Sequence, residues 1–523
     1  MNVTLICADD DCWALGMRSI SSYLKDAGHR TRLVFAGEEN GFLSDRSLEN
    51  IRALSENSEL IGVSSMSRGS QRAKAIIKAL KPLRKPIAWG GMHPTLYPED
   101  CVGHADIVCR GEGEEFMLEL AEQVASGKDF HDMRNGAYMQ NGRLVLNDIR
   151  PLISDLDMLP LADFSFADEF RVNGQTTIQP HPPTSSTSSI LFSGSRGCVC
   201  QCHYCSNSQL KLLYAGKGRY ARKMSIPRFV KSATACREKF PNARYFYFTD
   251  EDFFARPLDD FREFAEIYPE KVGLPFECMA SPQQITEEKM ALLTRAGLWR
   301  VDVGVESGSD RIKREVFNRP VSNEIVMRSV GILNRYPQVV TYCFFIIGNP
   351  YENREDLLGT ISLLRRMGPP YFLRTYNLVF IPGTILFEKA CRDGIINGME
   401  DSGFEMDFLA GLGTGNHAWK SNNLYLNSLV FLMAGKSTPS RLGFVPRFLV
   451  PFLVRPRVID FMDRHHAISH AIINAAQGGL RMRREGLRIA SKILNDPRAA
   501  YGFRLARKST PSPRPGSETR AAS

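Results

Sequence analysis

The sequence of 523 residues predicts an α/β protein in which two different parallel sheets follow each other along the chain. Strand and helix patterns alternate through the first 130 residues, and glycine-rich turns follow the strands there. Such repeated βα units favour a doubly wound sheet. Six further apolar strands recur between about residues 190 and 400, an order that suits a partial parallel barrel better than another open sheet. A mainly helical region is expected after the barrel.

In the first part, short apolar strands are separated by amphipathic helices. Gly16–Ala27 has helical periodicity and is followed by Gly28, a residue type favoured just after a helix end. Gln71–Leu80 and Glu115–Val124 are the other clear helices. The strands are predicted at Val3–Ala8, Arg32–Phe35, Leu60–Ser64, Pro86–Trp89 and Ile107–Val108. Ligands of such sheets bind at the carboxyl ends of the strands, where the glycine-rich turns fall.

Residues 131–189 are irregular and rich in turn signals, so we expect a linker between a domain at 1–130 and a domain at 190–400. The strands of the second domain are predicted at Ile190–Ser193, Tyr245–Phe248, Phe276–Met279, Val301–Val305, Tyr342–Ile347 and Tyr376–Val379. Chemistry in barrels gathers at the carboxyl ends of the strands. We therefore expect the functional residues of this domain in the loops after these strands.

Cysteine usage and hydropathy point to a reduced, cytoplasmic protein. The 12 cysteines are scattered without the spacing of a disulfide framework. The first residues lack the basic and apolar segments of a signal peptide, and no apolar run is long enough to span a membrane.

The formal net charge of +9 is concentrated in the last fifth of the chain, where 18 Lys and Arg face 5 Asp and Glu from Lys420 onward. We expect residues 401–507 to be helical and basic, and residues 508–523 to be disordered. The helical region is expected to cap the barrel mouth, and the alternative is peripheral contact with an anionic membrane through apolar residues beside arginines. Sparse aromatic residues among the basic ones argue against nucleic-acid binding.

Three cysteines at the start of the second domain carry most of the functional information. Cys198, Cys202 and Cys205 have the spacing C-x3-C-x2-C, so three thiolates on one loop can bind three irons of a [4Fe–4S] cluster and leave the fourth iron open. A zinc site would need a fourth ligand, for which His203 is the candidate. Cys200 offers a competing C-x-C-x-C pattern, but we expect it to be a bystander.

The cysteine loop and the motifs around it resemble the radical S-adenosylmethionine (SAM) superfamily. The first domain resembles the cobalamin-binding, Rossmann-like domain of the subgroup that contains the class B methyltransferases. The likeness covers about residues 1–390. Besides the cysteine loop, it rests on Gly90-Gly-Met-His-Pro-Thr95, Gly111-Glu-Gly-Glu114, Thr249-Asp-Glu-Asp252, Gly304-Val-Glu-Ser-Gly-Ser309, Phe345-Ile-Ile-Gly-Asn-Pro350 and Ile381-Pro-Gly-Thr384.

For the barrel, the resemblance implies that SAM chelates the open iron. Acidic residues after the second strand would hold its amino group, residues after the fourth strand its ribose, and the remaining ones the adenine. These SAM residues are Tyr204, Asp250, Glu251, Asp252, Glu306, Ser307, Gly348 and Pro350. Ser281 lies where many relatives have a basic residue, so no partner is assigned to the SAM carboxylate.

For the first domain, the resemblance implies a cobalamin whose nucleotide tail lies under the glycine-rich turns. The implied contacts are Ser64, Ser65, Gly90, Gly91 and Glu112. Trp13 stands where the best-known cobalamin fold has its cobalt-ligating histidine, and an indole is only a hydrogen-bond donor. We therefore expect base-off methylcobalamin without a histidine ligand. His93 is the alternative ligand, but we expect it to be structural.

The resemblance implies an enzyme that methylates an unactivated carbon of a small molecule, through a 5′-deoxyadenosyl radical and methylcobalamin. A lipid, a tetrapyrrole or another natural-product intermediate would suit the apolar and basic tail. The alternatives are an oxidative cyclisation or rearrangement with the same cofactors, and a non-catalytic cluster or cobalamin sensor. An electron donor such as flavodoxin or ferredoxin is implied as a partner. No catalytic side chain is assigned.

Overall fold

The computed structural model describes residues 1–9, 11–37, 43–172, 179–180, 187–403, 423–465, 467–468 and 471. The chain separates into two units, residues 1–470 and 471–523. Every feature below belongs to the first unit. The segment expected to be disordered, 508–523, lies outside the described residues, as does most of the basic segment before it.

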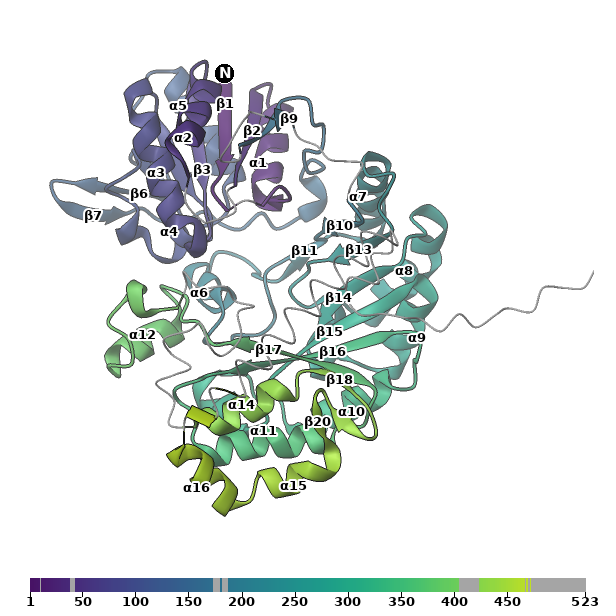
Figure 1. The fold of residues 1–523 in the computed structure, drawn as a ribbon. Helices are drawn as coiled ribbons and strands as arrows, with labels where there is room; N and C mark the ends of the chain where they lie inside the picture. The colour runs from purple at the N-terminus through teal and green to yellow at the C-terminus, as the bar shows by residue number, and fades with distance from the viewer. Residues whose placement is uncertain are drawn as a thin grey trace, which may run out of the picture. The chain divides into compact units, whose positions relative to one another are not determined.

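The first sheet is doubly wound, as the sequence predicts (Figure 1). Its order is β7-β6-β5-β4-β3-β1-β2-β8-β9, and neighbouring strands from β5 to β8 are parallel. The strands of its parallel core are β1 (Asn2–Cys7), β2 (Arg30–Ala36), β3 (Leu60–Ser64), β4 (Ile87–Gly90) and β5 (Ile107–Cys109). The chain order reverses between β1 and β3, which is the point where open α/β sheets bind ligands.

Helices cover both faces of this sheet, so its central strands are apolar on both sides. α1 (Leu15–Asp26) and α5 (Glu114–Ala125) pack on one face with buried residues such as Leu24 and Phe116. α2 (Asp45–Ser55) and α3 (Ser70–Leu80) pack on the other with Ile51 and Ile76. Burial on both faces explains why these strands read as continuous apolar runs.

The segment expected to be an irregular linker adds strands to the first sheet. β6 (Gly136–Gln140) and β7 (Arg143–Leu146) form an antiparallel hairpin beside β5, while β8 (Glu169–Val172) is parallel to β2 and pairs with β9 (Gln179–Pro180). Hydropathy could not reveal these strands, because β7 is mostly exposed. In β8, Glu169 is buried only because it pairs with Arg18 at 2.6 Å.

The second sheet begins with six parallel strands, in agreement with the predicted partial barrel. Its order is β10-β13-β14-β15-β16-β17-β18-β19-β20. The parallel strands are β10 (Ser189–Phe192), β13 (Tyr245–Phe248), β14 (Phe276–Ala280), β15 (Leu298–Glu306), β16 (Val340–Ile347) and β17 (Tyr371–Asn377). The helices between them are α7 (Ile226–Lys239), α8 (Leu258–Lys271), α9 (Glu287–Ala296), α10 (Asn323–Leu333) and α11 (Arg354–Arg366).

The described part of the C-terminal region contains strands as well as helices. β18 (Gly435–Ser437) is antiparallel to β17 and continues the second sheet through β19 (Arg441–Leu442) and β20 (Val445–Pro446). α14 (Leu424–Leu432), α15 (Val450–Leu453) and α16 (Pro456–Arg464) complete the region. Among the described helices, none is both long and apolar enough to cross a bilayer.

Candidate functional site

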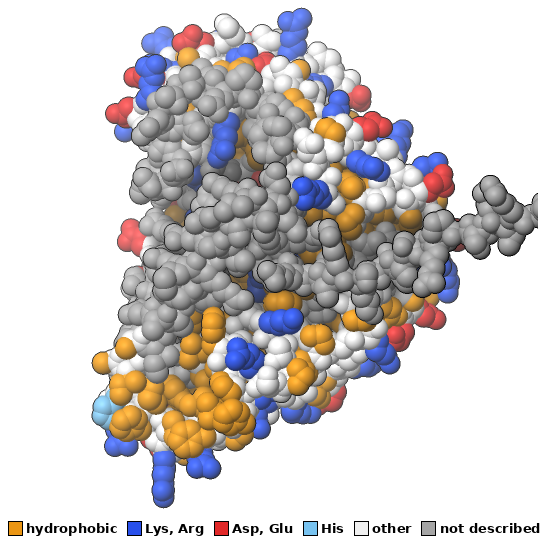
Figure 2. Space-filling view, turned by 45° about the vertical axis from the view of Figure 1, so that its right-hand side comes forward, with side chains coloured by type: hydrophobic (Ala, Val, Ile, Leu, Met, Phe, Trp, Pro, Cys, Tyr) orange, Lys and Arg blue, Asp and Glu red, His pale blue; other side chains and the backbone are white. Residues whose placement is uncertain are grey.

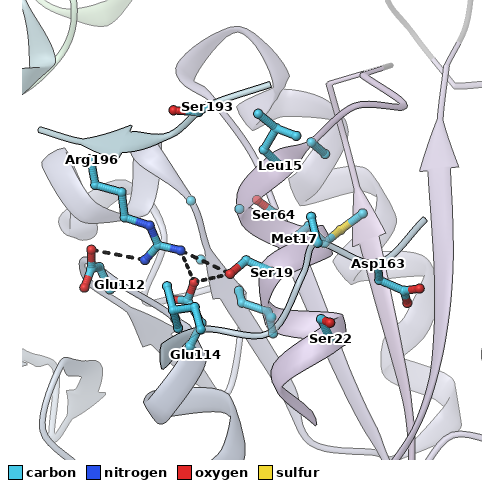
Figure 3. A pocket seen from close by; sticks show the side chains of 18 of the residues that line it. Leu15, Met17, Ser19, Ser22, Ser64, Glu112, Glu114, Asp163, Ser193 and Arg196 are labelled. Carbon is cyan, nitrogen blue, oxygen red and sulfur yellow. Dashed lines mark hydrogen bonds and ion pairs between the residues drawn. The ribbon is translucent and has the colours of Figure 1, made fainter. Parts of the chain in front are cut away.

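A cavity of about 840 Å³ lies at the carboxyl ends of β1, β3 and β4 and extends to the start of the second sheet. Its lining includes all five residues proposed as cobalamin contacts, Ser64, Ser65, Gly90, Gly91 and Glu112. Of the proposed SAM residues, only Glu251 lines it. Figure 3 shows part of this lining, with Ser64, Glu112 and Ser193, which directly follows β10, around the same space.

The two glycines after β4 differ in how strictly the fold requires them. Gly91 has φ +105°, and a Cβ atom there would lie 2.6 Å from the carbonyl oxygen of Ser65. A Cβ atom on Gly90 would lie no closer than 3.5 Å to the side chain of Cys109, an ordinary contact. The turn can therefore approach β3 only because residue 91 has no side chain.

The two serines after β3 also differ. Ser65 is 1% exposed, and its hydroxyl accepts a hydrogen bond from Nε1 of Trp89 at 3.0 Å. Ser64 is half-buried, and its side chain lies beside the cavity in Figure 3. Ser64 is thus the better placed of the two to contact a bound molecule, while Ser65 fixes the β3–β4 edge.

Glu112 reaches the cavity with its carboxylate already paired. β11 (Ser195–Arg196) and β12 (Arg222–Lys223) form an antiparallel ribbon in which Arg196 and Arg222 lie directly opposite each other. Glu112 lies 3.2 Å from Nη1 of Arg196 and 2.5 Å from Nη2 of Arg222. It neutralises two adjacent cations that would otherwise repel each other.

Arg196 also takes part in a second group of charged and polar side chains in the wall of the cavity (Figure 3). Its Nη2 contacts the buried carboxylate of Glu114, which in turn accepts a hydrogen bond from the hydroxyl of Ser19 at 2.7 Å. Burial raises the pKa of Glu114, but Arg196 and Ser19 outweigh this effect and hold it below its usual value. Since Arg196 lies two residues before Cys198, these ion pairs connect the cysteine loop to the wall of the cavity.

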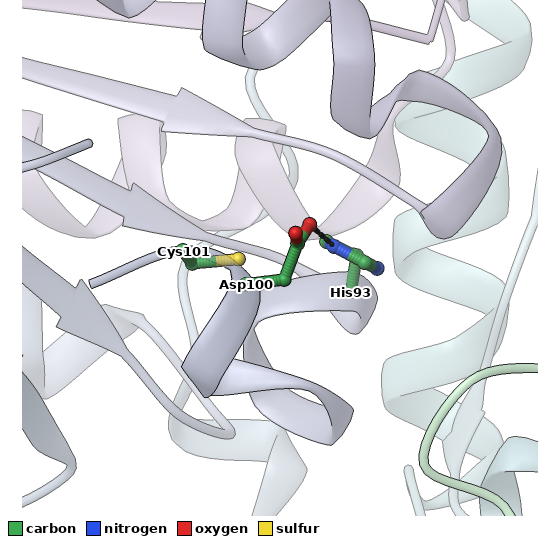
Figure 4. Close-up of side chains that lie close together, drawn as sticks. All are labelled: His93, Asp100 and Cys101. Atoms are coloured by element: carbon green, nitrogen blue, oxygen red, sulfur yellow. Dashed lines mark hydrogen bonds and ion pairs between the residues drawn. The ribbon is translucent and has the colours of Figure 1, made fainter. Parts of the chain in front are cut away.

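His93 does not line the cavity, and its ring is engaged elsewhere. It is fully buried, with Nδ1 3.2 Å from the hydroxyl of Ser67 and Nε2 3.0 Å from the carboxylate of Asp100. His93, Asp100 and Cys101 place ligand atoms within 4.8 Å of one another (Figure 4). Asp100 also binds the ammonium of Lys74 at 2.6 Å, so a cation there would meet a positive charge. The arrangement is that of a structural histidine.

Trp13 is likewise directed into packing. Its ring lies 5.8 Å from that of Phe164 and 5.1 Å from that of Phe240, and the residue is not part of the cavity lining. The position that would hold a cobalt-ligating histidine in the best-known cobalamin fold therefore contributes an aromatic contact here.

The cysteine loop is tightly folded between β11 and α6 (Ser206–Leu213). Gly197 has φ +81°, and a Cβ atom there would lie 2.5 Å from the carbonyl oxygen of Tyr220. A single zinc ion with Zn–S bonds of about 2.3 Å needs its sulfurs about 3.8 Å apart. Among the described residues, Cys198, Cys202 and Cys205 do not form a group with all ligand atoms within 4.8 Å. The loop as folded therefore does not present these three thiols together as ligands of a single zinc ion.

The thiol of Cys200 lies between those of Cys198 and Cys202, close enough to interact with both, and it also approaches the loop after β14. Its sulfur lies 3.9 Å from the hydroxyl of Ser281, and Nε2 of Gln283 approaches it at 3.8 Å. Its backbone N–H points to the sulfur of Cys198 at 3.4 Å. Cys200 thus contacts polar side chains outside the cysteine loop as well as the sulfurs within it.

The three acidic residues after β13 are held differently. Asp250 is 1% exposed and accepts a hydrogen bond from the backbone N–H of Gly194 at 3.1 Å through one oxygen. Burial raises the pKa of Glu251, and it raises the pKa of Asp252 to about 6. Oδ1 of Asp250 accepts no hydrogen bond among the described atoms but lies 3.8 Å from the guanidinium of the buried Arg256, whereas Oδ2 of Asp252 has no hydrogen-bond partner among them.

Of the remaining proposed SAM residues, Tyr204 belongs to the cysteine loop, and the others lie at the ends of β15 and β16 or directly after them. Glu306 has φ +73°, and burial raises its pKa. The ring of Tyr204 packs edge-on against Phe317 at 4.8 Å. Ser307 is buried and accepts a hydrogen bond from the backbone N–H of Ser309 at 3.1 Å. In the loop after β16 lies Gly348, whose N–H donates to Oδ1 of Asn427 at 2.9 Å, and then Pro350.

The sequence analysis missed Arg319, a buried cation beside the cysteine loop. Its guanidinium lies 3.4 Å from the sulfur of Cys202 and 3.3 Å from the hydroxyl of Ser281, and it donates to the carbonyl oxygen of Gly304 at 2.9 Å. Its Nε has no hydrogen-bond partner among the described residues. Arg319 thus brings positive charge to the place where Ser281 lacks it. Only the fold reveals this, because Arg319 lies on another loop.

Comparison with known proteins agrees with both halves of this geometry. Residues 1–121 match the model of the B12 binding domain, and residues 192–364 match that of the radical SAM superfamily. An uncharacterized methyltransferase of Pyrococcus horikoshii is 23% identical over 73% of this chain and 79% of its own length. The anaerobic magnesium-protoporphyrin IX monomethyl ester cyclase of Rubrivivax gelatinosus is 24% identical over 67% of this chain and 61% of its own length.

The solved structure of OxsB, a cobalamin-dependent S-adenosylmethionine radical enzyme with aqua-cobalamin and S-adenosylmethionine bound, has the same fold. It superposes with a TM-score of 0.61 at 15% identity, covering 94% of this chain and 75% of its own. A B12-binding domain followed by a radical SAM domain is the order found along this sequence. The chain therefore belongs to the family of cobalamin-dependent radical SAM enzymes.

Proposed function

We propose that the protein methylates an unactivated carbon of a small-molecule substrate, using a [4Fe–4S] cluster, SAM and base-off cobalamin. The observation that carries this proposal is the cavity of the first domain, which is closed on one side by residues directly before the cysteine loop. Together, the bound cofactors would supply one-electron reduction, a hydrogen-abstracting group and a methyl donor. The named relative of Pyrococcus horikoshii supports methyl transfer as the reaction.

The side chains around the cysteine loop fit the charged end of SAM. An amino acid head group carries one ammonium and one carboxylate. The unpartnered Oδ2 of Asp252 is an acceptor suited to the ammonium, and the Nε of Arg319, which has no hydrogen bond among the described residues, is a donor suited to the carboxylate. Buried polar atoms without partners are costly, so a ligand that satisfies both would be stabilised. We assign Arg319 the role that the sequence left open at Ser281.

The cavity fits cobalamin without a protein ligand to the cobalt. Ser64 and the backbone around Gly91 would contact the nucleotide tail, while the paired Glu112 and Arg196 would present a polar wall. Both nitrogens of His93 are engaged, and Trp13 is packed against aromatic rings. Cys198, Cys202 and Cys205 would hold the cluster, and an external electron donor such as flavodoxin or ferredoxin would reduce it.

The decisive test counts products of the anaerobically reconstituted, reduced protein with cobalamin. Methyl transfer through both uses of SAM requires equal amounts of 5′-deoxyadenosine, S-adenosylhomocysteine and methylated product. Formation of 5′-deoxyadenosine without S-adenosylhomocysteine would contradict methylation and indicate a cyclisation or rearrangement. No SAM cleavage at all would indicate a non-catalytic sensor, and a protein purified without corrin absorption bands would remove cobalamin from the proposal.

The assignment of Arg319 has its own test, which does not depend on turnover. Arg319→Gln should weaken SAM binding, measured by equilibrium dialysis, by about tenfold or more, because a charge-assisted hydrogen bond contributes about 1.5–3 kcal/mol. Arg314→Gln, an exposed arginine on the preceding segment, is the matched control and should bind SAM normally. Unchanged SAM affinity in an Arg319→Gln variant that keeps its iron would contradict the assignment, and loss of iron from this variant would indicate instead a role in holding Cys202.

A further inference from the structure

The segment from β19 to α16 exposes large apolar side chains that no described element covers. The side chain of Phe448 is 78% exposed, and the large apolar side chains nearby in the sequence are between 38% and 51% exposed. The C-terminal aromatic surface, as we name it, consists of Phe444, Phe448, Leu449, Phe452 and Phe461. Figure 2 shows hydrophobic side chains gathered at the bottom of the view, where α15 and α16 lie in Figure 1, with Lys and Arg at their border.

These side chains are not an unfinished core, because the same segment has a separate buried face. Val450 and Ile459 are 0% and 1% exposed, so α15 and α16 already pack inward. The hydroxyl of Tyr425 on α14 donates to the carbonyl oxygen of Leu453 at 3.0 Å and fixes α15 in place. The phenylalanines therefore lie on the outward side of well-packed elements.

The charges of this segment are sorted between its two sides. The acidic residues of α16 pair with Arg354 of α11, at 2.8 Å for Asp460 and 3.2 Å for Asp463. The arginines remain exposed, and the guanidinium of Arg455 lies 5.4 Å from the ring centre of Phe452. The exposed cations of this segment are Arg441, Arg455, Arg457 and Arg464.

We propose that the C-terminal aromatic surface docks on the surface of an anionic lipid bilayer. Apolar rings beside cations are what an interfacial segment needs, since the rings enter the boundary of the acyl chains and the cations meet the lipid phosphates. A second copy of the chain would instead bring arginines against arginines, which costs free energy. No described helix can span a bilayer, so the contact is peripheral. The inference goes beyond the proposed function and does not depend on it.

The test is co-sedimentation of the full-length protein with vesicles, either of phosphatidylcholine alone or with about a third phosphatidylglycerol. The wild type should bind the anionic vesicles, and less so at high salt. The double variant Phe448→Ser, Phe452→Ser should lower the partition coefficient about tenfold or more, because it removes two rings that would be buried in the bilayer boundary. Arg455→Gln with Arg457→Gln should remove much of the preference for anionic vesicles.

The matched control is Met139→Ser with Met158→Ser, two exposed apolar residues outside this surface, which should leave vesicle binding unchanged. All variants retain the basic residues after 471, so any difference belongs to the described surface. Vesicle binding by the phenylalanine variant at the wild-type level would overturn the proposal. So would a wild type that fails to bind vesicles but forms dimers that the same variant dissociates. Unchanged iron content in each variant verifies folding.

Discussion

Replacing Gly91 by alanine should locally destabilise the edge of the first sheet that lines the cavity. The new Cβ atom would lie 2.6 Å from the carbonyl oxygen and 2.9 Å from the nitrogen of Ser65, both backbone atoms that cannot rotate away. The backbone at residue 91 has φ +105°, which an L side chain rarely adopts. With ψ −171° this conformation is adopted almost only by glycine and costs about 1–3 kcal/mol, and the overlap costs about 1–3 kcal/mol, so together we expect about 2–6 kcal/mol.

Gly90→Ala is the matched control, because it adds the same methyl group one residue earlier. Its nearest neighbour would be the Cβ atom of Cys109 at 3.5 Å, an ordinary van der Waals distance. Its φ lies outside the left-handed region, so alanine adopts the backbone without strain. This variant should therefore keep the stability of the wild type.

The assay is hydrogen–deuterium exchange of the full-length protein, read on peptides that carry β3 and β4, because a chain of this length need not unfold in one step. A decrease of 2 kcal/mol in the free energy of local unfolding accelerates amide exchange by about 30-fold. Gly91→Ala should show this acceleration or more in both strands, and Gly90→Ala should not. Equal exchange in the two variants, or faster exchange only in Gly90→Ala, would refute the steric argument.

Three further predictions concern single side chains. Burial raises the pKa of Asp9 to about 6, so the folded protein binds a proton on this carboxyl more tightly than the unfolded chain does. The protein therefore loses stability as the pH rises from about 4 to about 6. Asp9→Asn should remove that loss, by at most about 3 kcal/mol, and raise the thermal midpoint at pH 7.5 more than at pH 4.5; an equal rise at both pH values would contradict this sign. Cys200→Ser should retain the iron and sulfide of the reconstituted wild type, while Cys202→Ser should lose most of both; iron loss in Cys200→Ser would assign it as a ligand. His93→Asn should lower stability by about 1–3 kcal/mol through its lost contacts, yet leave the absorption spectrum of bound cobalamin unchanged. A changed cobalt spectrum would instead make His93 a ligand.

Much of the architecture follows from local sequence patterns. The strands of both parallel sheets are buried on both sides, and their apolar runs show in the sequence. Gly28, with φ +86°, marks the helix end that its position predicts. The cysteine spacing is also a local pattern, since all three thiols belong to one loop. Such features depend on residues close together in the chain, and their chemistry can be read in sequence order.

Other features depend on residues that only the folded chain brings together. β8 could not be recognised, because Glu169 is buried in it only through Arg18, about 150 residues away in sequence but 2.6 Å away in space. Glu112 was expected only to contact cobalamin, and the two arginines that the β11–β12 ribbon places against it could not be foreseen.

The candidate site divides in the same way. The sequence by itself determined the fold class, the cysteine loop and the glycine-rich turns, because each is set by the order of neighbouring residues. The tertiary structure alone decided that residue 91 must be glycine whereas residue 90 need not be, and that the ring of His93 is engaged away from the cavity. It also decided that Arg319 supplies the charge missing at Ser281. The physical reason is that steric exclusion and charge pairing act through space, between segments whose separation along the chain carries no signal.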